Sequence, residues 1–305
     1  MDKIQIDTVL NRIEEATGQH ANPRIAAIVH RMVRDLFHMI EDLDIQPEEF
    51  WSGLNFLAEA GRSGELGLIA PGLGFDHFLD LRMDEAESQA GIAGGTPRTI
   101  EGPLYVAGAP VAQGEARLDD GTGEGEVLVM EGQVKDGAGQ PLANAVVEVW
   151  HANALGNYSY FDPTQSAFNL RRSIVTDGEG RYRFRSIMPV GYSVPPNGAT
   201  DRLLKQLDRH GTRPAHIHFF VSAPGHRKLT TQINIDGDPY LWDDFAFATR
   251  EGLVPPITRV SDAAAMAALG VDQPFASIRF DFTLHADQAD APQAEVARQR
   301  ASVEA

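Results

Sequence analysis

The sequence of 305 residues contains no cysteine. This absence excludes thiolate zinc sites, iron–sulfur clusters, cysteine nucleophiles and disulfide bonds in one step. The chain also lacks an apolar run long enough to cross a bilayer. Its first residues lack the basic and apolar regions of an export signal. We therefore expect no membrane span and a cytoplasmic protein.

Positive charge is also scarce. The chain has 26 Lys and Arg residues against 43 Asp and Glu residues, and its formal net charge is −17. Such a surface repels nucleic acid and anionic membranes, so neither is expected as a partner. The acidity indicates a self-repelling surface and names no substrate.

The N-terminal part has the periodicity of helices. Asn22 and Pro23 resemble a cap followed by proline at the first helical position. Apolar residues then recur at three- and four-residue steps as far as Leu43. A weaker helix is expected around residues 8–16, and another after Pro47. The apolar stripe predicts a core or a subunit interface.

The pattern changes to short strands after a glycine-rich break at residues 91–97. Beyond it, β-branched and aromatic runs alternate with glycine turns, without helical periodicity between them. The expected strands lie at residues 127–130, 145–150, 182–184, 215–221, 229–235 and 277–284. The pattern predicts a mainly β fold, an antiparallel β-sandwich that follows an α-helical domain.

We expect three segments: a helical domain at residues 1–95, the sandwich at residues 96–285 and a polar tail at residues 286–305. Two long connections interrupt the sandwich, at residues 151–172 and 187–214. Loops of this length inside a compact domain are usually functional or disordered. Their aromatic residues and prolines favour a function.

His216 and His218 stand two residues apart on an expected strand. Residues at this spacing project from the same face of a strand, so the two imidazoles converge. Converging imidazoles on a rigid element suit a metal ion. The same pattern also occurs as a purely structural feature or in zinc and cupin-type sites, so it leaves the metal open.

Two of the six tyrosines, Tyr158 and Tyr192, lie in the long connections. A phenolate is a hard, anionic oxygen donor, and two phenolates with two imidazoles suit Fe(III) better than Zn(II) or Cu(I). Loop tyrosines most often pack with the hydroxyl at the surface. The residues alone therefore leave tyrosine ligation open.

Several ordered motifs resemble the intradiol ring-cleavage dioxygenases. They are the segments 96–105, 149–153 with Tyr158, 191–192, 213–218, 225–233 and 243–246. The resemblance spans nearly the whole chain, including the N-terminal helices. It is strongest for the members that convert catechol to cis,cis-muconate.

The resemblance implies a mononuclear non-haem Fe(III) held by two tyrosines and two histidines. In this sequence these ligands are Tyr158, Tyr192, His216 and His218. It also implies that Arg213 stabilises negative charge on the substrate ring and that Gln232 orients the site. The residues implied to line a catechol pocket are Leu68, Pro71, Ile100, Pro103, Leu104, Phe245 and Ala246.

The resemblance further implies a reaction and an assembly. Catechol would bind Fe(III) through both oxygens and displace Tyr192, and both atoms of O2 would enter the product. The N-terminal helices resemble the linker through which relatives form homodimers. Some relatives hold a lipid-like molecule there.

Two alternatives stay open at this point. Residues 132–145 and 176–178 also resemble transthyretin-like sandwich modules, which often have no catalytic role, and fold alone does not decide. The other alternative keeps the reaction but prefers a chlorinated catechol or hydroxyquinol, because one pocket substitution can shift the preference. Extradiol cleavage is not favoured, since it needs ferrous iron and a site of two histidines and one carboxylate.

Overall fold

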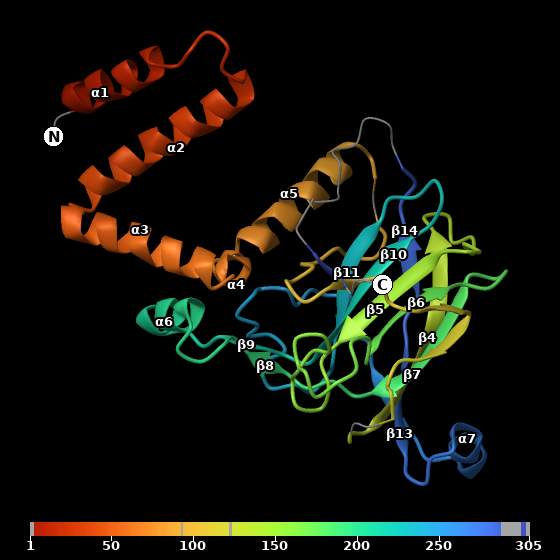
Figure 1. Ribbon diagram of the computed structural model, residues 1–305. Coiled ribbons are helices and arrows are strands. Elements are labelled where there is room, and N and C mark those ends of the chain that lie inside the picture. Colours follow the sequence, from red (N-terminus) through yellow and green to blue (C-terminus); the bar gives the residue numbers. More distant parts are fainter. Residues whose placement is uncertain (1–2, 93, 122–123, 288–299, 303–305) are drawn as a thin grey trace. The chain divides into compact units, whose positions relative to one another are not determined.

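The structure is a computed structural model that describes residues 3–92, 94–121, 124–287 and 300–302 (Figure 1). Its contacts divide the chain into two compact units, residues 1–64 and 65–305. This division falls within the helical part of the chain. The boundary expected at residue 95 follows the change from helix to strand and stays a prediction.

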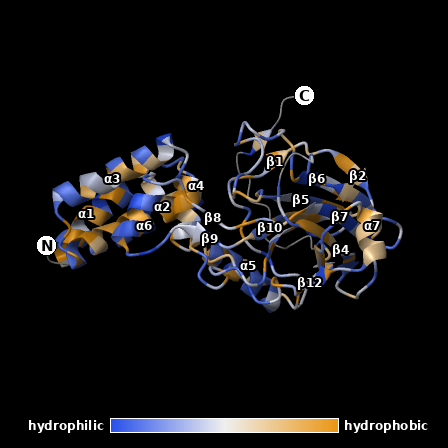
Figure 2. Ribbon diagram, turned by 90° about the horizontal axis from the view of Figure 1, so that it is seen from below, coloured by the Kyte–Doolittle hydropathy of each residue, from blue (hydrophilic) through white to orange (hydrophobic). Residues whose placement is uncertain are grey.

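The first unit contains the helices α1 (Lys3–Glu15), α2 (Pro23–Asp42) and α3 (Pro47–Arg62). Asn22 caps α2 as expected, since its side-chain oxygen accepts hydrogen bonds from the backbone N–H groups of Arg24 and Ile25. Ile6 and Leu10 of α1 are buried, and α1 contacts α2. No residue of α2 is buried, and hydrophobic and hydrophilic residues lie side by side along it (Figure 2).

The second unit opens with helices α4 (Leu66–Gly72) and α5 (Phe75–Gln89), which the periodicity did not predict. Helix α5 reverses the usual amphipathic pattern. Phe75 and Phe78 are exposed, whereas Asp76 and Asp80 are buried. Among the described residues, no helix combines the length and hydrophobicity that a membrane crossing needs.

Two sheets form the sandwich of the second unit. The first contains, in spatial order, β11 (Leu229–Asn234), β10 (His216–Ser222), β5 (Val146–His151), β6 (Arg171–Val175) and β2 (Val111–Gln113). The second contains β12 (Ile257–Val260), β13 (Phe275–Arg279), β4 (Val127–Asp136), β7 (Arg181–Ile187) and β3 (Glu115–Arg117), with β14 (Phe282–Leu284) also paired to β4.

Shorter elements complete this unit. Strand β1 (Val106–Ala107) pairs with β15 (Ala301–Ser302), and β8 (Tyr192–Ser193) pairs with β9 (Thr212–Arg213). Helix α6 (Ala199–Gln206) lies within the second long connection, and α7 (Ala263–Leu269) lies between β12 and β13.

The expected β-sandwich with an N-terminal helical part is confirmed, although the sheets are mixed. The central pairs, such as β10 with β11 and β5, are antiparallel. The pairs of β2 with β6 and of β3 with β7 are parallel. The single strand expected at residues 277–284 is interrupted, and both of its parts, β13 and β14, run parallel to β4.

The main hydrophobic core of the sandwich includes alternate residues of β10. Ile217, Phe219 and Val221 are buried in this core. Because neighbouring side chains on a strand point to opposite faces, His216 and His218 project from the other face of β10. The sandwich therefore supplies a rigid strand that presents both imidazoles on one side.

The polar tail expected at residues 286–305 lies largely outside the described residues. In its described part, the Arg300 guanidinium donates to both carboxylate oxygens of Glu101 at 2.9 and 3.0 Å. Ala301 and Ser302 then pair with β1. Residues 300–302 are thus attached to the segment that leads into the sandwich.

Candidate metal centre and active site

Strand β10 lies between β11 and β5 and carries both histidines. In this register His218 lies opposite Gln232 of β11 and opposite Trp150 of β5. His216 and His218 are both 1% exposed, and their Nε2 atoms are 3.0 Å apart. The strand brings the two imidazoles together and surrounds them with fixed neighbours.

Tyr158 and Tyr192 reach the same place from the two long connections. The Tyr158 hydroxyl lies 3.4 Å from Nε2 of His216. The two tyrosine rings meet edge to face with their centroids 5.4 Å apart, and the Tyr192 ring lies 5.6 Å from the His216 ring. Tyr158, Tyr192 and His216 therefore converge with His218, the fourth side chain that the sequence singled out.

The spacing of the nitrogen atoms fits a shared metal ion. Imidazole nitrogens lie about 2.1 Å from a first-row metal, so two of them at a right angle on one ion stand about 3.0 Å apart, as the two Nε2 atoms do. Nδ1 of His216 lies 2.7 Å from the carbonyl oxygen of Pro214. That contact places the N–H on Nδ1 and leaves the Nε2 lone pair for a metal. Two imidazoles with two phenols form a hard donor set.

Burial keeps both imidazoles neutral. It lowers the pKa of His216 to about 3, with Arg213 as the second cause, and it lowers the pKa of His218 well below its ordinary value, with His216 as the second cause. Burial also raises the pKa of Tyr158 well above its ordinary value, and Tyr192 adds to the effect. The imidazoles are ready to bind a metal, whereas Tyr158 needs a nearby positive charge to lose its proton.

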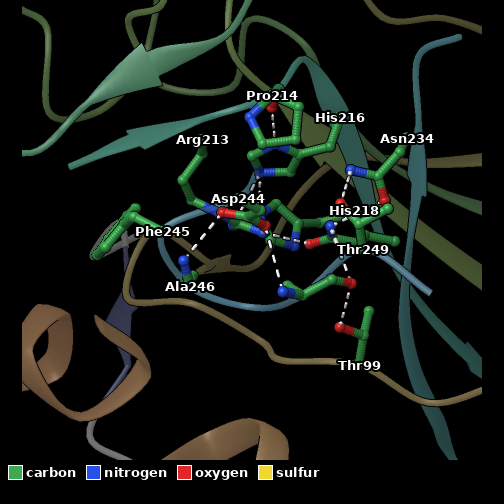
Figure 3. Close-up of polar contacts among 12 residues, drawn as sticks. Thr99, Arg213, Pro214, His216, His218, Asn234, Asp244, Phe245, Ala246 and Thr249 are labelled. Carbon is green, nitrogen blue, oxygen red and sulfur yellow. Dashed lines mark hydrogen bonds and ion pairs between the residues drawn. The ribbon is translucent and has the colours of Figure 1, made fainter. Parts of the chain in front are cut away.

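Arg213 lies beside these donors and is almost fully buried. Its Nη1 is 3.0 Å from Nε2 of His216, and its Nη2 donates to Oε1 of Gln232 at 2.8 Å. Asp244 accepts from Nε at 3.3 Å and from Nη2 at 3.1 Å (Figure 3). Burial disfavours the charged form of Arg213, but Asp244 and the neighbouring tyrosines raise its pKa above the ordinary value. The site thus contains a permanent cation.

Comparison with known proteins identifies the family. A family model described as "Dioxygenase" matches residues 100–286, and one described as "Catechol dioxygenase N terminus" matches residues 22–91. The chain belongs to the intradiol dioxygenase family.

This dioxygenase is 72% identical over 257 residues to Catechol 1,2-dioxygenase 2 of Acinetobacter lwoffii, with 84% of this chain and 94% of the relative covered. It is 55% identical over 295 residues to Catechol 1,2-dioxygenase of Acinetobacter guillouiae, with 96% and 97% covered. The crystal structure of wild-type Acinetobacter radioresistens catechol 1,2 dioxygenase matches with a TM-score of 0.95 at 55% identity, over 99% of both chains. The chain is therefore an enzyme, and a non-catalytic transthyretin-like module is excluded.

Most of the expected pocket residues of this dioxygenase gather in one place. Ile100, Phe245 and Ala246 belong to one buried hydrophobic cluster, and Leu68 packs against it. Pro71 is buried in the same helix as Leu68. Segments far apart in the sequence thus form one apolar wall.

Leu104 and Pro103 lie elsewhere. Leu104 packs against a second buried cluster that contains Trp150 and Tyr158. Pro103 is exposed, and its side chain lies 3.6 Å from the position that a Cβ atom on Gly67 would take. Leu104 therefore packs against the cluster that contains the candidate ligand Tyr158, whereas Pro103 stands outside both clusters.

Three residues of the site carried no expected role. The Trp150 ring stacks on the His218 imidazole at 5.0 Å and 6°. Gly102 has a φ of 70°, and a Cβ atom there would lie 3.6 Å from Cε1 of His218. Asp244 lies in a matched motif, but its role depends on Arg213, 31 residues away. The role of Asp244 could have been predicted from the fact that a buried arginine needs a buried counterion.

Proposed function

We propose that this dioxygenase opens the ring of catechol between its two hydroxyl-bearing carbons, with O2 as the oxidant and cis,cis-muconate as the product. The convergence of two imidazoles and two phenols beside Arg213 carries the proposal. The relatives named catechol 1,2-dioxygenase support it. Mononuclear non-haem Fe(III) would be held by Tyr158, Tyr192, His216 and His218. Bound there, it would supply the Lewis acidity that favours ionised catechol oxygens and a ring reactive toward O2.

The two tyrosines have different tasks in this proposal. Tyr158 is 4% exposed and packs in a buried aromatic cluster, so it stays in place. Tyr192 is only partly buried and lies on the two-residue strand β8. Tyr192 would therefore be the ligand that gives way to the substrate, and its phenolate oxygen would take up one of the catechol protons.

Arg213 and Gln232 act on the charge of the substrate. The fixed guanidinium stabilises negative charge that develops on the ring, which is an effective use of a preorganised cation. Gln232 accepts a hydrogen bond from Arg213 and holds one edge of the guanidinium. Gln232 orients the cation and does not react itself.

The apolar wall favours an unsubstituted ring. The residues Leu68, Ile100, Phe245 and Ala246 offer no side-chain hydrogen-bonding group. The third hydroxyl of hydroxyquinol would be buried against them without a partner, which costs binding free energy. Catechol has no such group.

Specificity constants for catechol, 4-methylcatechol, 4-chlorocatechol and hydroxyquinol, measured with the iron-containing enzyme in air, test this proposal. We expect the highest kcat/KM for catechol and cis,cis-muconate as its product. A clear preference for hydroxyquinol would contradict the proposed substrate. A yellow semialdehyde product would contradict intradiol cleavage itself.

We also propose that helices α2 and α3 mediate homodimerisation. Although α2 has no buried residue, its Ile25, Met32 and adjoining Leu43 are 57%, 52% and 69% exposed, and Trp51 of α3 is 61% exposed. A large exposed apolar stripe is typical of an interface. The same stripe suits a lipid-like molecule held between subunits. Sedimentation of the purified protein, with mass spectrometry of extracted lipid, tests both points.

A further inference from the structure

The carboxylate of Asp244 is buried beside the guanidinium of Arg213. The side chains of these two residues are 1% and 5% exposed, respectively. Burial would raise the pKa of Asp244, but Arg213 lowers it below its ordinary value, so the pair is ionised. Little solvent surrounds a buried pair of this kind, so water does not compete for the hydrogen bonds that fix its orientation.

Asp244 fixes the orientation of the guanidinium plane. Its two oxygens accept hydrogen bonds from Nε and Nη2 of Arg213, and Oε1 of Gln232 also accepts one from Nη2. Because a guanidinium is planar and rigid, fixing Nε and Nη2 also fixes Nη1. Nη1 is the nitrogen that lies 3.0 Å from Nε2 of His216, on the side of the candidate metal ligands.

The same carboxylate also holds the apolar wall. Oδ1 of Asp244 accepts the backbone N–H of Ala246 at 3.0 Å, and Oδ2 accepts the backbone N–H of Ala248 at 3.3 Å. These bonds shape the turn that places Phe245 and Ala246 in their buried cluster. One side chain thus contacts both the cation and the wall.

We propose that Asp244 is a positioning residue that aligns Arg213 with the substrate-binding wall. This inference rests on the proposed function, since the aligned cation matters only if negative charge develops on a bound ring. Asp244 does not touch the substrate. It holds Nη1 toward the reacting centre and sets the distance between that nitrogen and the wall.

The variant Asp244→Asn keeps the size of the side chain but replaces one acceptor oxygen by an N–H2 group. An amide N–H2 group accepts no hydrogen bond, so one bond from Arg213 and one from a backbone N–H are lost and the guanidinium turns away. We expect kcat to fall about 100-fold, the loss typical of misplaced groups, with iron content and the visible absorption band retained. Asp244→Glu keeps the charge and should recover part of the turnover. Asp84→Asn, which alters the ion pair with Arg98 in another part of this unit, serves as the matched control and should leave kcat unchanged.

A double-mutant cycle separates positioning from a merely structural role. We expect Asp244→Asn to cost much less turnover in an Arg213→Lys background than in the wild type, because the two residues act as one unit. Additive losses, or wild-type kcat in an iron-loaded Asp244→Asn enzyme, would overturn the inference. If Asp244→Asn does not fold, the same double-mutant cycle is measured with Asp244→Glu and Arg213→Lys, and additive losses there would overturn the inference. A wild-type enzyme that fails to cleave catechol would refute the proposed function instead.

Discussion

A buried phenol such as Tyr158 holds its proton more tightly than a phenol in water, because burial penalises the phenolate. Burial has the opposite effect on the imidazoles of His216 and His218, which stay neutral. In the proposed site, a bound cation would offset the cost of ionising Tyr158 and would accept the lone pairs of the two imidazoles. Arg213, already paired with Asp244, adds a positive charge beside these side chains.

Replacing Tyr158 by phenylalanine tests its role as a ligand. We expect Tyr158→Phe to lose iron or its visible charge-transfer absorption, because the phenolate oxygen is gone while the ring still packs. Tyr160→Phe is the control, since Tyr160 is 42% exposed and lies outside the four-residue site. Iron content and the visible spectrum of both purified variants are the measurements. A Tyr158→Phe protein with the full band would rule out ligation by this residue.

Replacing Arg213 tests the electrostatic role. We expect Arg213→Ala to lower kcat about 100- to 1000-fold and to lower iron content far less. The variant also leaves the buried Asp244 carboxylate without its counterion, so we expect a loss of about 3–5 kcal/mol in the free energy of unfolding. Arg31→Ala is the control, because its side chain is 75% exposed. Normal turnover by Arg213→Ala would contradict the electrostatic role proposed for this residue.

At the scale of elements, strand β10 and helix α2 could be predicted from the sequence. The β-branched and aromatic run after His216 has the pattern of a buried strand, and Asn22 with the apolar period defines the start of α2. Helix α5 could not be predicted this way, since it buries Asp80 and exposes Phe78. Its pattern depends on neighbours that come from other parts of the chain.

The residues of the candidate site also divide into those that the local sequence predicts and those that it does not. Two histidines at strand spacing could be found from local sequence alone, whereas the tyrosines and Arg213 needed a family resemblance. Trp150 was missed because its role arises from pairing across the sheet. Asp244 was missed because its role arises from a contact between distant segments. Local patterns do not contain that information.

The segment around Gly102 offers a test at this scale. Gly102 has a positive φ, and a Cβ atom there would touch His218. We expect Gly102→Val to lose stability through backbone strain of about 1–2 kcal/mol and also to bind iron more weakly, because its Cγ atoms reach toward the imidazole. Gly139→Val has the same kind of strain at φ 80° with nothing within 4 Å, so it should lose stability only. Equal iron content in the two variants would contradict this reading of the segment.

At the scale of the whole molecule, the second unit contains a buried carboxyl group whose ionisation opposes folding. Burial raises the pKa of Asp80 to about 7 from its usual 3.8, although Arg98 and Arg250 act against the shift. Between these two pH values the unfolded chain releases this proton and the folded chain keeps it, so the folded state loses stability as the pH rises. Above about pH 7 the ionised Asp80 lowers the free energy of unfolding by its full amount.

The variant Asp80→Asn should remove this pH dependence. We expect it to be more stable than the wild type at pH 8, by up to about 4 kcal/mol, and to differ little in this respect below pH 4. Unfolding midpoints from pH 4 to pH 8, measured by circular dichroism, check the prediction. Asp35→Asn, at a side chain of α2 that is 55% exposed, should follow the wild-type profile. An Asp80→Asn variant that is less stable at pH 8 would contradict the proposed cost.

The metal and colour of the purified wild-type protein test the central claim most directly. Tyrosinate bound to Fe(III) absorbs visible light strongly, so we expect about one iron per chain and a wine-red protein whose spectrum changes when catechol is added without O2. A colourless protein with stoichiometric iron, or a different metal at the site, would contradict the account.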